Sequence, residues 1–375
     1  MHQGLESAAA ATLFLCGDVM TGRGVDQILQ QPSAPQLHEP YVDSALEYLA
    51  LAERASGPVA RPAQPAYVWG DALAELERAR PQARIVNLET SVTTSEDAWP
   101  AKGIHYRMHP ANVACLSAAG IDCCVLANNH VLDWGYRGLA ETLDTLHATG
   151  LRTAGAGRDD AEACAPAEIP LAGGSRLLVF AYGMESSGVS PDWAAGERRA
   201  GVAFLPDLSA RSFEAVARRV RAAKRARDLA LVSLHWGGNW GYEVARAERA
   251  FAHALVDAGA DLVHGHSSHH PKGIEVYGDR LILYGCGDFL NDYEGIGGYA
   301  SFRAELTLMY LPTLDAANGR LLGLELVPMR IRRLRLERAC EADARWLDAM
   351  LGREGKKLGT RVERAAGGSL ALRWE

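Results

Sequence analysis

Short apolar runs alternate with amphipathic segments along most of this chain. Uninterrupted apolar runs are typical of strands buried on both faces, whereas amphipathic helices repeat apolar positions every three or four residues. On this basis we predict strands at residues 12–16, 84–88, 121–127, 176–182, 229–235, 261–265 and 280–285. The predicted helices are 71–80, 110–119, 136–149, 210–227 and 246–258, the last of them capped by Gly259. This alternation predicts an α/β sandwich.

Two stretches depart from the alternation. Residues 31–68 are rich in Pro and Gln and lack strand periodicity, so we predict an excursion over the surface. Beyond about residue 303, two apolar segments flank the turn sequence DAANG and predict a β-hairpin, which a helix (341–353) and a short strand (369–374) follow. We therefore assign residues 1–310 to a main domain and residues 311–375 to a small C-terminal extension packed on the same core.

Small polar clusters stand directly after most of the predicted strands. Because the carboxyl ends of strands in an open α/β sheet meet at one edge, where ligands bind, we expect these clusters to form one site. Several members have a plain structural alternative: Asp18 as a helix cap, Asn129 as part of an Asx-turn, His235 as a buried core histidine. The whole set, which favours a metal site, is Asp18, Glu89, Asn129, His235, His266 and His269.

These six side chains offer carboxylate, amide and imidazole ligands. Mixed oxygen and nitrogen ligands suit Zn²⁺, Mn²⁺, Fe²⁺ or Ni²⁺, whereas purely oxygen ligands suit Mg²⁺ or Ca²⁺. We expect one or two divalent ions, with Mn, Zn, Fe or Ca as the candidates. Glu89 is our candidate for a carboxylate that bridges two metals about 3.5–4 Å apart.

Two further pairs of residues are candidates for catalysis and substrate binding. His130 follows Asn129 directly and would project into the same pocket, where Asp133 could orient its ring for general acid or base chemistry. Arg23 and Arg107 are candidate anion clamps, because guanidinium groups suit phosphate or carboxylate. Ordinary surface salt bridges explain these two arginines equally well.

Composition and charge narrow the class of protein and its partners. The hydrophobic fraction of 48%, the charged fraction of 23% and the net charge of −7 suit a soluble enzyme, and no basic patch indicates nucleic acid or an anionic membrane as a partner. A small anionic substrate stays possible, because a bound metal reverses the local field. The seven cysteines are odd in number and sit mostly in apolar runs, which predicts buried free thiols in a reducing compartment. Without an export signal or a membrane span, we expect a cytoplasmic protein.

At this point the motifs resemble a known family. GDVMTGRGVD, NLETSVT, ANNHVLDWGYRGL, HWGGNWGYE and the long GADLVHGHSSHHPKGIEVYGDRLILYGCGDFLNDYEG resemble the CapA proteins of poly-γ-glutamate and capsule biosynthesis, relatives of the calcineurin-like metallophosphatases. The resemblance covers roughly residues 11–300 and implies a four-layer αββα sandwich of the metallo-dependent phosphatase type. It implies that Asp18 is the aspartate of the first motif, Glu89 replaces the bridging aspartate, Asn129 is the amide ligand, His130 is the catalytic histidine, His235 is the lone histidine of the fourth motif, and His266 and His269 are the paired histidines of the last.

This chain departs from the family pattern at the metal site. Metallophosphatases usually have a histidine two residues after the first aspartate, and Met20 stands there in this chain. A thioether is a poor ligand for a hard divalent ion, so a single metal or a loosely held second one is expected. The last motif, often GHHPH, reads GHSSH here, with Ser267 and Ser268 in its middle.

Three functions follow from the residues and the resemblance. We expect a metal-dependent hydrolase of phosphoesters or amides that serves a poly-γ-glutamate or polyglutamine-type capsule or cell-wall polymer, with a small anionic, peptidic or polyglutamyl substrate. One alternative is a peptide epimerase that uses His130 with His269 or Asp18 on opposite faces of a Cα. The other is a non-catalytic accessory subunit of a polymer-synthesis machinery.

Overall fold

Two β-sheets contain most strands of the computed structural model, which describes residues 10–375. The larger sheet has the strand order β19-β20-β17-β16-β1-β2-β5-β6, with β15 paired to β1 and β18 to β17. Its strands are β1 (Ala10–Val19), β2 (Ala83–Leu88), β5 (Cys123–Val125), β6 (Arg152–Ala154), β15 (Asp288–Leu290), β16 (Leu306–Asp315), β17 (Leu321–Arg332), β18 (Arg335–Arg338), β19 (Thr360–Arg364) and β20 (Leu370–Trp374).

The second sheet has the order β13-β14-β12-β11-β9-β8, in which β9, β11, β12 and β14 run parallel. Its strands are β8 (Ala167–Pro170), β9 (Arg176–Gly183), β11 (Leu229–His235), β12 (Leu262–His266), β13 (Ile274–Tyr277) and β14 (Arg280–Leu283). Two short pairs complete the strands: β3 (Ser91–Val92) with β4 (Arg107–Met108), and β7 (Ala156–Gly157) with β10 (Gly201–Val202).

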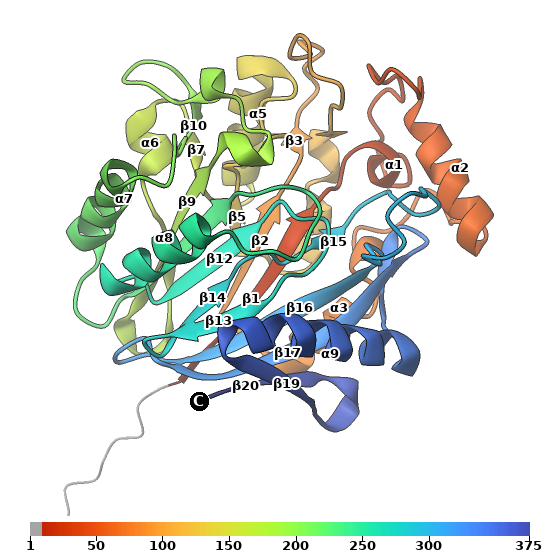
Figure 1. Ribbon diagram of the computed structural model, residues 1–375. Coiled ribbons are helices and arrows are strands. Elements are labelled where there is room, and N and C mark those ends of the chain that lie inside the picture. Colours follow the sequence, from red (N-terminus) through yellow and green to blue (C-terminus); the bar gives the residue numbers. More distant parts are fainter. Residues whose placement is uncertain (1–9) are drawn as a thin grey trace, which may run out of the picture.

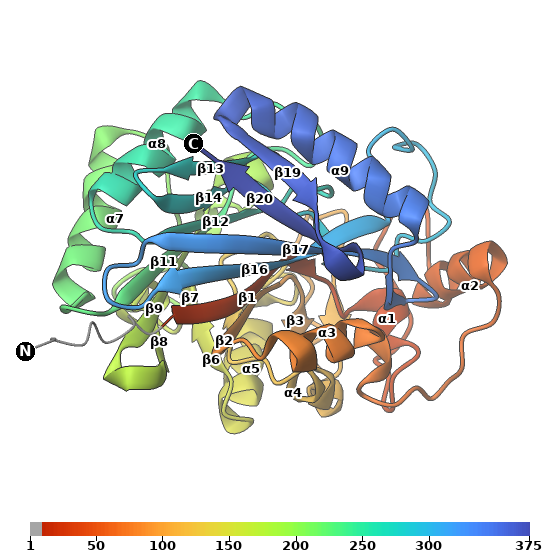
Figure 2. The ribbon, with the colours of Figure 1, turned by 90° about the horizontal axis from the view of Figure 1, so that it is seen from below.

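Helices cover the outer faces of the two sheets (Figures 1 and 2). They are α1 (Arg23–Asp26), α2 (Ala45–Ser56), α3 (Ala72–Ala79), α4 (Ala114–Ala118), α5 (Gly135–Ala148), α6 (Asp160–Cys164), α7 (Ala210–Ala223) and α8 (Arg246–Asp257). Helix α9 (Glu341–Gly355) instead packs on the apolar cluster between the two sheets, to which it contributes Leu347, Met350 and Leu351. The short 3-10 helices are η1 (Tyr67–Trp69), η2 (Pro110–Asn112), η3 (Ala172–Gly174), η4 (Glu185–Ser187), η5 (Pro191–Trp193), η6 (Lys356–Leu358) and η7 (Ala366–Gly368).

The core has three apolar clusters that follow the alternation of strand residues between faces. Leu15 of β1 and Leu231 of β11 belong to the cluster between the two sheets. Cys16, one residue further along β1, points the other way into the cluster under α1 to α5, and Val232 of β11 points into the cluster under α7 and α8. The layers therefore run helix, sheet, sheet, helix.

Most of the predicted elements are present close to their predicted bounds, including the hairpin of β16 and β17 around DAANG. Residues 31–68 are more than a surface excursion, because α2 lies there and buries Tyr48 and Leu49 against the core. The expected boundary at 310/311 falls inside β16, which pairs with β1 as well as with β17. The hairpin thus continues the larger sheet beside its central strand (Figure 2).

Two other sequence predictions concern cysteines and membranes. All seven cysteines are free thiols, but Cys340 is exposed and Cys164 only partly buried, so the prediction of seven buried thiols was wrong for these two. Cys340 stands just before α9, where the chain reaches the surface. Across residues 10–375, no helix has both the length and the apolar character that a membrane crossing requires.

Candidate metal centre

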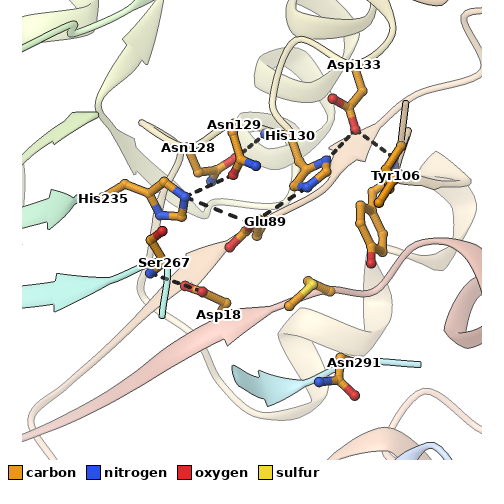
Figure 3. A network of polar contacts seen from close by, with 12 residues as sticks. Asp18, Glu89, Tyr106, Asn128, Asn129, His130, Asp133, His235, Ser267 and Asn291 are labelled. Carbon is orange, nitrogen blue, oxygen red and sulfur yellow. Dashed lines mark hydrogen bonds and ion pairs between the residues drawn. The ribbon is translucent and has the colours of Figure 1, made fainter. Parts of the chain in front are cut away.

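The polar clusters predicted from the strand ends meet at one edge of the two sheets (Figure 3). Asp18 lies near the end of β1, and Glu89 directly follows β2. His235 and His266 are the last residues of the parallel neighbours β11 and β12, where they are register partners. Parallel strands bring their carboxyl ends together, which explains why residues distant in sequence share this edge.

Asp18, His235 and His266 form the centre of the cluster. Each offers one ligand atom, and these atoms all lie within 4.8 Å of one another. The Nδ1 atoms of His235 and His266 are 2.7 Å apart, and His266 Nδ1 lies 3.8 Å from Asp18 Oδ1. Carboxylate and imidazole groups at such distances could hold a divalent ion.

Glu89 and Asn129 join this centre through His235. His235 Nε2 lies 2.9 Å from Asn129 Oδ1 and 3.9 Å from Glu89 Oε1. Asn87, at the end of β2, donates to Asp18 Oδ1 at 2.7 Å and holds that carboxylate in place. The sequence places Asn87 in the NLE cluster, but nothing in the cluster distinguishes this supporting amide from a ligand.

His269 lies beside the centre, next to a carboxylate that we did not predict. Its Nδ1 is 2.9 Å from Asp288 Oδ1, which leaves Nε2 as the ring atom able to bind a metal. A signal for Asp288 exists in the sequence: Gly287-Asp288 repeats the Gly-Asp pair of residues 17 and 18 after another apolar strand. Burial opposes protonation of His269, but the Asp288 charge raises its pKa above the usual value.

The two Gly-Asp pairs are packed against each other. A Cβ atom on Gly17 would lie 1.6 Å from Gly287 O, so only glycine fits at residue 17. The amide of Asp18 donates to Gly287 O at 2.9 Å, and Asp18 and Asp288 are register partners of β1 and β15. The close backbone approach therefore sets the two carboxylates side by side.

Negative charge accumulates in this centre. Burial and then the neighbouring Asp288 raise the pKa of Asp18 to about 7. Burial, Asp18 and Asp288 raise the pKa of Glu89 well above its usual value. Burial also lowers the pKa of His235 and His266, so both rings are neutral and able to act as ligands. Buried carboxylates that repel one another, beside neutral imidazoles, fit a divalent cation.

His130 and Asp133 form a dyad at the rim of the centre. His130 Nδ1 lies 2.7 Å from Asp133 Oδ2, and its Nε2 faces Glu89 Oε1 at 3.8 Å. Lys102 pairs with Asp133 Oδ1 at 2.7 Å, and the amide of Tyr106 donates to Asp133 Oδ2 at 2.6 Å. Burial lowers the pKa of His130 to about 4, although Asp133 acts in the opposite direction. The sequence did not indicate a role for Lys102 or Tyr106. Both precede the motif that contains His130 and Asp133, in a segment without a clear helix or strand pattern.

Arg23 is engaged by acidic side chains of the protein itself. Its guanidinium donates to Glu39 at 2.7 Å and to both carboxylate oxygens of Asp292, and it is buried. This placement does not favour the anion clamp expected from the sequence. Arg107 donates to Ser95 O and lies over the Trp134 ring, and none of these contacts is to a candidate ligand.

Comparison with known proteins assigns the family. The family described as "Bacterial capsule synthesis protein PGA_cap" matches residues 12–293. The chain belongs to this family. It is 47% identical to probable polyglutamine synthesis accessory proteins of two Mycobacterium tuberculosis strains, over 94% of this chain and 93% of theirs. It is 28% identical to the PGA biosynthesis protein CapA of Bacillus subtilis, over 74% of this chain and 62% of that protein. The expected membership of the CapA family is thereby confirmed.

Among solved structures, a Thermus thermophilus protein is 12% identical, over 84% of this chain and 97% of that one, at a TM-score of 0.37. A TM-score this low does not assign the fold.

In this PGA_cap protein, Met20 is buried and its Sδ accepts from Tyr293 OH at 3.6 Å. Ser267 adopts φ +95 and donates its amide to Asp18 Oδ2 at 3.2 Å (Figure 3). A non-glycine residue with positive φ beside a candidate ligand is typical of a functional site.

Proposed function

We propose that this PGA_cap protein is a divalent-metal-dependent hydrolase that serves the synthesis of a glutamyl capsule or cell-wall polymer. The observation that carries the proposal is the His130–Asp133 dyad beside the ligand cluster, with His130 Nε2 turned toward Glu89. A metal site that only stabilises the fold does not require an oriented histidine that is not itself a ligand. The relatives named for polyglutamine synthesis and for capsule biosynthesis supply the biological context.

The residues that would hold one or two divalent ions are Asp18, Glu89, Asn129, His235, His266 and His269, with Asp288 orienting His269. We further propose that the helix–sheet–sheet–helix layering is that of the metallo-dependent phosphatases. A divalent ion at this place supplies Lewis acidity that polarises the ester or amide to be cleaved. Asn87 and the amide of Ser267 keep Asp18 in one orientation for that purpose.

His130 would move the proton. In the neutral ring, Nδ1 donates to Asp133, so Nε2 carries no hydrogen and can accept one. Burial lowers the pKa of His130 to about 4 and favours this neutral form. Nε2 would take a proton from the water that attacks the ester or amide on the side of Glu89, and would return it to the oxygen or nitrogen that leaves as the bond breaks. Lys102 would keep Asp133 charged throughout.

A second candidate function is a non-catalytic accessory subunit of a polymer-synthesis machinery. The observation that favours it is the printed description of the Mycobacterium tuberculosis relatives as accessory proteins. Under this alternative the same residues hold a structural metal and the dyad is not needed.

Metal content and turnover distinguish the two functions. The protein is loaded with Mn²⁺ or Zn²⁺ and assayed on p-nitrophenyl phosphate and bis-p-nitrophenyl phosphate. For a hydrolase, His130→Ala is expected to retain the metal and to lose turnover by about 10²- to 10⁴-fold. His147→Ala, which removes an exposed histidine of α5, is the matched control and keeps full turnover.

Other outcomes contradict the proposal in different ways. Wild-type protein that binds metal but turns over neither substrate, nor any glutamyl oligomer, favours the accessory function. Deuterium incorporation into a peptide without hydrolysis favours an epimerase instead. If neither ion binds after reconstitution, the metal site itself is wrong.

A further inference from the structure

Tyr293 links a candidate metal ligand to the candidate proton carrier. Together with His269 it lines a cavity of about 850 Å³ beside the metal centre, and the two rings stand edge to face with their centroids 5.4 Å apart. Its hydroxyl lies 2.9 Å from the hydroxyl of Tyr106, whose ring packs edge to face on that of His130 with centroids 4.5 Å apart. Tyr293 is therefore near the reaction centre, although the hydrolase as described above assigns it no part.

The position of Tyr293 is fixed by the same carboxylate that orients His269. Asp288 accepts from His269 Nδ1 through Oδ1 at 2.9 Å, and from the side-chain amide of Asn291 through Oδ2 at 2.7 Å. Asn291 Oδ1 in turn accepts from the backbone amide of Tyr293 at 3.0 Å. These hydrogen bonds hold Tyr293 at one distance from His269, as a group that acts on a reaction centre requires.

The hydroxyl of Tyr293 has a good donor but a poor acceptor. Tyr106 OH donates to it at 2.9 Å, whereas its own hydrogen points to Met20 Sδ at 3.6 Å. A thioether is a weak acceptor, and a hydroxyl that accepts one hydrogen bond becomes a stronger donor in another. A substrate oxygen that carries negative charge would therefore bind this hydrogen more strongly than Met20 does.

Tyr106 is held firmly behind this hydroxyl. It is fully buried, its backbone amide donates to Asp133 Oδ2 at 2.6 Å, and the guanidinium of Arg23 lies over its ring at 4.3 Å from the centroid. Figure 3 shows that Asp133 contacts both Tyr106 and His130. The hydroxyl of Tyr293 is thus supported by the same carboxylate that orients His130.

The proposed hydrolysis requires a donor of this kind. Attack of water on a phosphoester or an amide builds negative charge on an oxygen that does not leave, and preorganised donors next to that oxygen stabilise the charge. On the side of Met20 the centre has a thioether, which is a poor ligand for a hard divalent ion. The hydroxyl of Tyr293 contacts this thioether, so it is placed to stabilise charge where a metal ligand is lacking.

We propose that Tyr293 is a further catalytic residue, whose hydroxyl donates a hydrogen bond to the substrate oxygen on which negative charge builds up as water attacks. The inference rests on the proposed hydrolase function for the reaction itself. Tyr293 keeps its proton throughout, because His130 Nε2 takes the proton of the attacking water and returns it to the atom that leaves. Only the hydrogen bond of Tyr293 changes partner, from Met20 Sδ to the substrate oxygen.

Binding of orthovanadate tests the proposal without turnover. Orthovanadate can take the five-coordinate geometry of phosphoryl transfer, and such analogues bind through the groups that stabilise the transition state. By calorimetry on the full chain loaded with Mn²⁺, we expect Tyr293→Phe to bind orthovanadate about 10- to 100-fold more weakly than the wild-type protein, with unchanged metal content. Equal affinities overturn the proposal, and so does a metal-loaded wild-type protein that binds no orthovanadate.

Tyr106→Phe is the matched comparison for Tyr293→Phe. Each variant breaks the hydrogen bond between the two hydroxyls, but only Tyr293→Phe removes the hydrogen that is offered to the substrate. The affinity for orthovanadate should therefore fall by no more than a few-fold in Tyr106→Phe. A loss as large as that of Tyr293→Phe would mean that the pair acts through packing alone, and it would overturn the proposal. Tyr67→Phe, which removes a hydroxyl bonded to Arg333 O, should bind orthovanadate like the wild-type protein.

Met20→Leu shows whether the contact with the thioether matters in itself. Leucine has about the volume of methionine but no acceptor atom. Because the hydrogen of Tyr293 is donated to the bound anion and not to sulfur, Met20→Leu should keep nearly the wild-type affinity for orthovanadate. A loss that matches that of Tyr293→Phe contradicts the proposal.

Turnover separates this inference from the hydrolase function. On p-nitrophenyl phosphate, Tyr293→Phe should lower kcat about 10- to 100-fold and leave KM nearly unchanged, because the hydrogen bond is made in the transition state. Full turnover in Tyr293→Phe rejects this inference and leaves the hydrolase in place. Orthovanadate binding that depends on Tyr293, in a protein that turns over no substrate, supports the hydroxyl as the anion donor and rejects the hydrolase.

Discussion

Asp18 and Asp288 are register partners on the parallel strands β1 and β15, and both carboxylates are buried. The strands can approach this closely because Gly17 and Gly287 meet without side chains. Two buried carboxylates at such a place repel each other, and burial together with Asp288 raises the pKa of Asp18 to about 7. The same repulsion between the carboxylates favours a divalent cation there.

The first prediction follows from this raised pKa. Between the unfolded value of about 4 and the folded value of about 7, folded Asp18 binds more protons than unfolded Asp18, so its contribution to stability falls as pH rises. The slope is at most about 1.4 kcal/mol per pH unit. Buried histidines with lowered pKa values, such as His130 and His264, act in the opposite direction, so the comparison must be with Asp18→Asn.

Urea unfolding of chelator-treated protein measures this effect. Relative to Asp18→Asn, the wild-type protein should lose free energy of unfolding as pH rises across that window. With saturating metal, the wild-type protein should instead gain free energy of unfolding relative to Asp18→Asn as pH rises. The reason is that the ion binds the deprotonated carboxylate in place of the proton. A wild-type stability that rises faster with pH than that of Asp18→Asn contradicts the prediction.

The second prediction concerns the orientation of His130. Asp133→Asn removes the carboxylate that accepts from His130 Nδ1 and allows the ring to take the other tautomer. If the protein is a hydrolase, turnover should fall about 10²- to 10⁴-fold while metal content stays unchanged. Lys102→Met is the comparison: it removes the ion pair with Asp133 and the 3.1 Å contact of Nζ with His130 Nδ1, but leaves the carboxylate that accepts from His130 in place, so its loss should be much smaller.

The third prediction separates a buried ion pair from a substrate clamp. Arg23→Ala leaves Glu39 and Asp292 buried without their cation, so the free energy of unfolding should fall by about 3–5 kcal/mol. Arg61→Ala, which removes a largely exposed pair with Glu53, should cost less than about 1 kcal/mol. Urea unfolding measures both. Normal stability with a raised KM in Arg23→Ala would instead restore the clamp interpretation.

The fourth prediction tests the approach of the two Gly-Asp pairs. Gly17→Ala places a methyl group 1.6 Å from Gly287 O, and should destabilise the fold by at least about 2 kcal/mol, because backbone must move. Gly352→Ala in α9 is the control: its added Cβ meets nothing within 4 Å, and it should stabilise by up to about 1 kcal/mol. Equal stabilities of the two variants would exclude the packing argument.

Local pattern was sufficient for most of the elements and for the strand ends at which the candidate site lies. Apolar runs end where Asp18, Glu89 and His235 begin the polar clusters, and parallel strands necessarily gather such ends at one edge. The helix α2 escaped prediction because it stands between Pro-rich segments, which gave the whole of residues 31–68 the character of a loop. Its buried residues Ala45, Tyr48, Leu49 and Ala52 do follow the helical period, so the signal was there to be found.

The sequence by itself therefore determined the α/β class, the strand ends and the chemical types of the candidate ligands. Only the tertiary structure decided that Asp288 stands beside Asp18 and that Arg23 is paired with Glu39 and Asp292. The physical reason is that periodicity records which face of an element is buried. Which charges neutralise one another depends on contacts between segments as far apart as residues 23 and 292, and no local pattern carries that information.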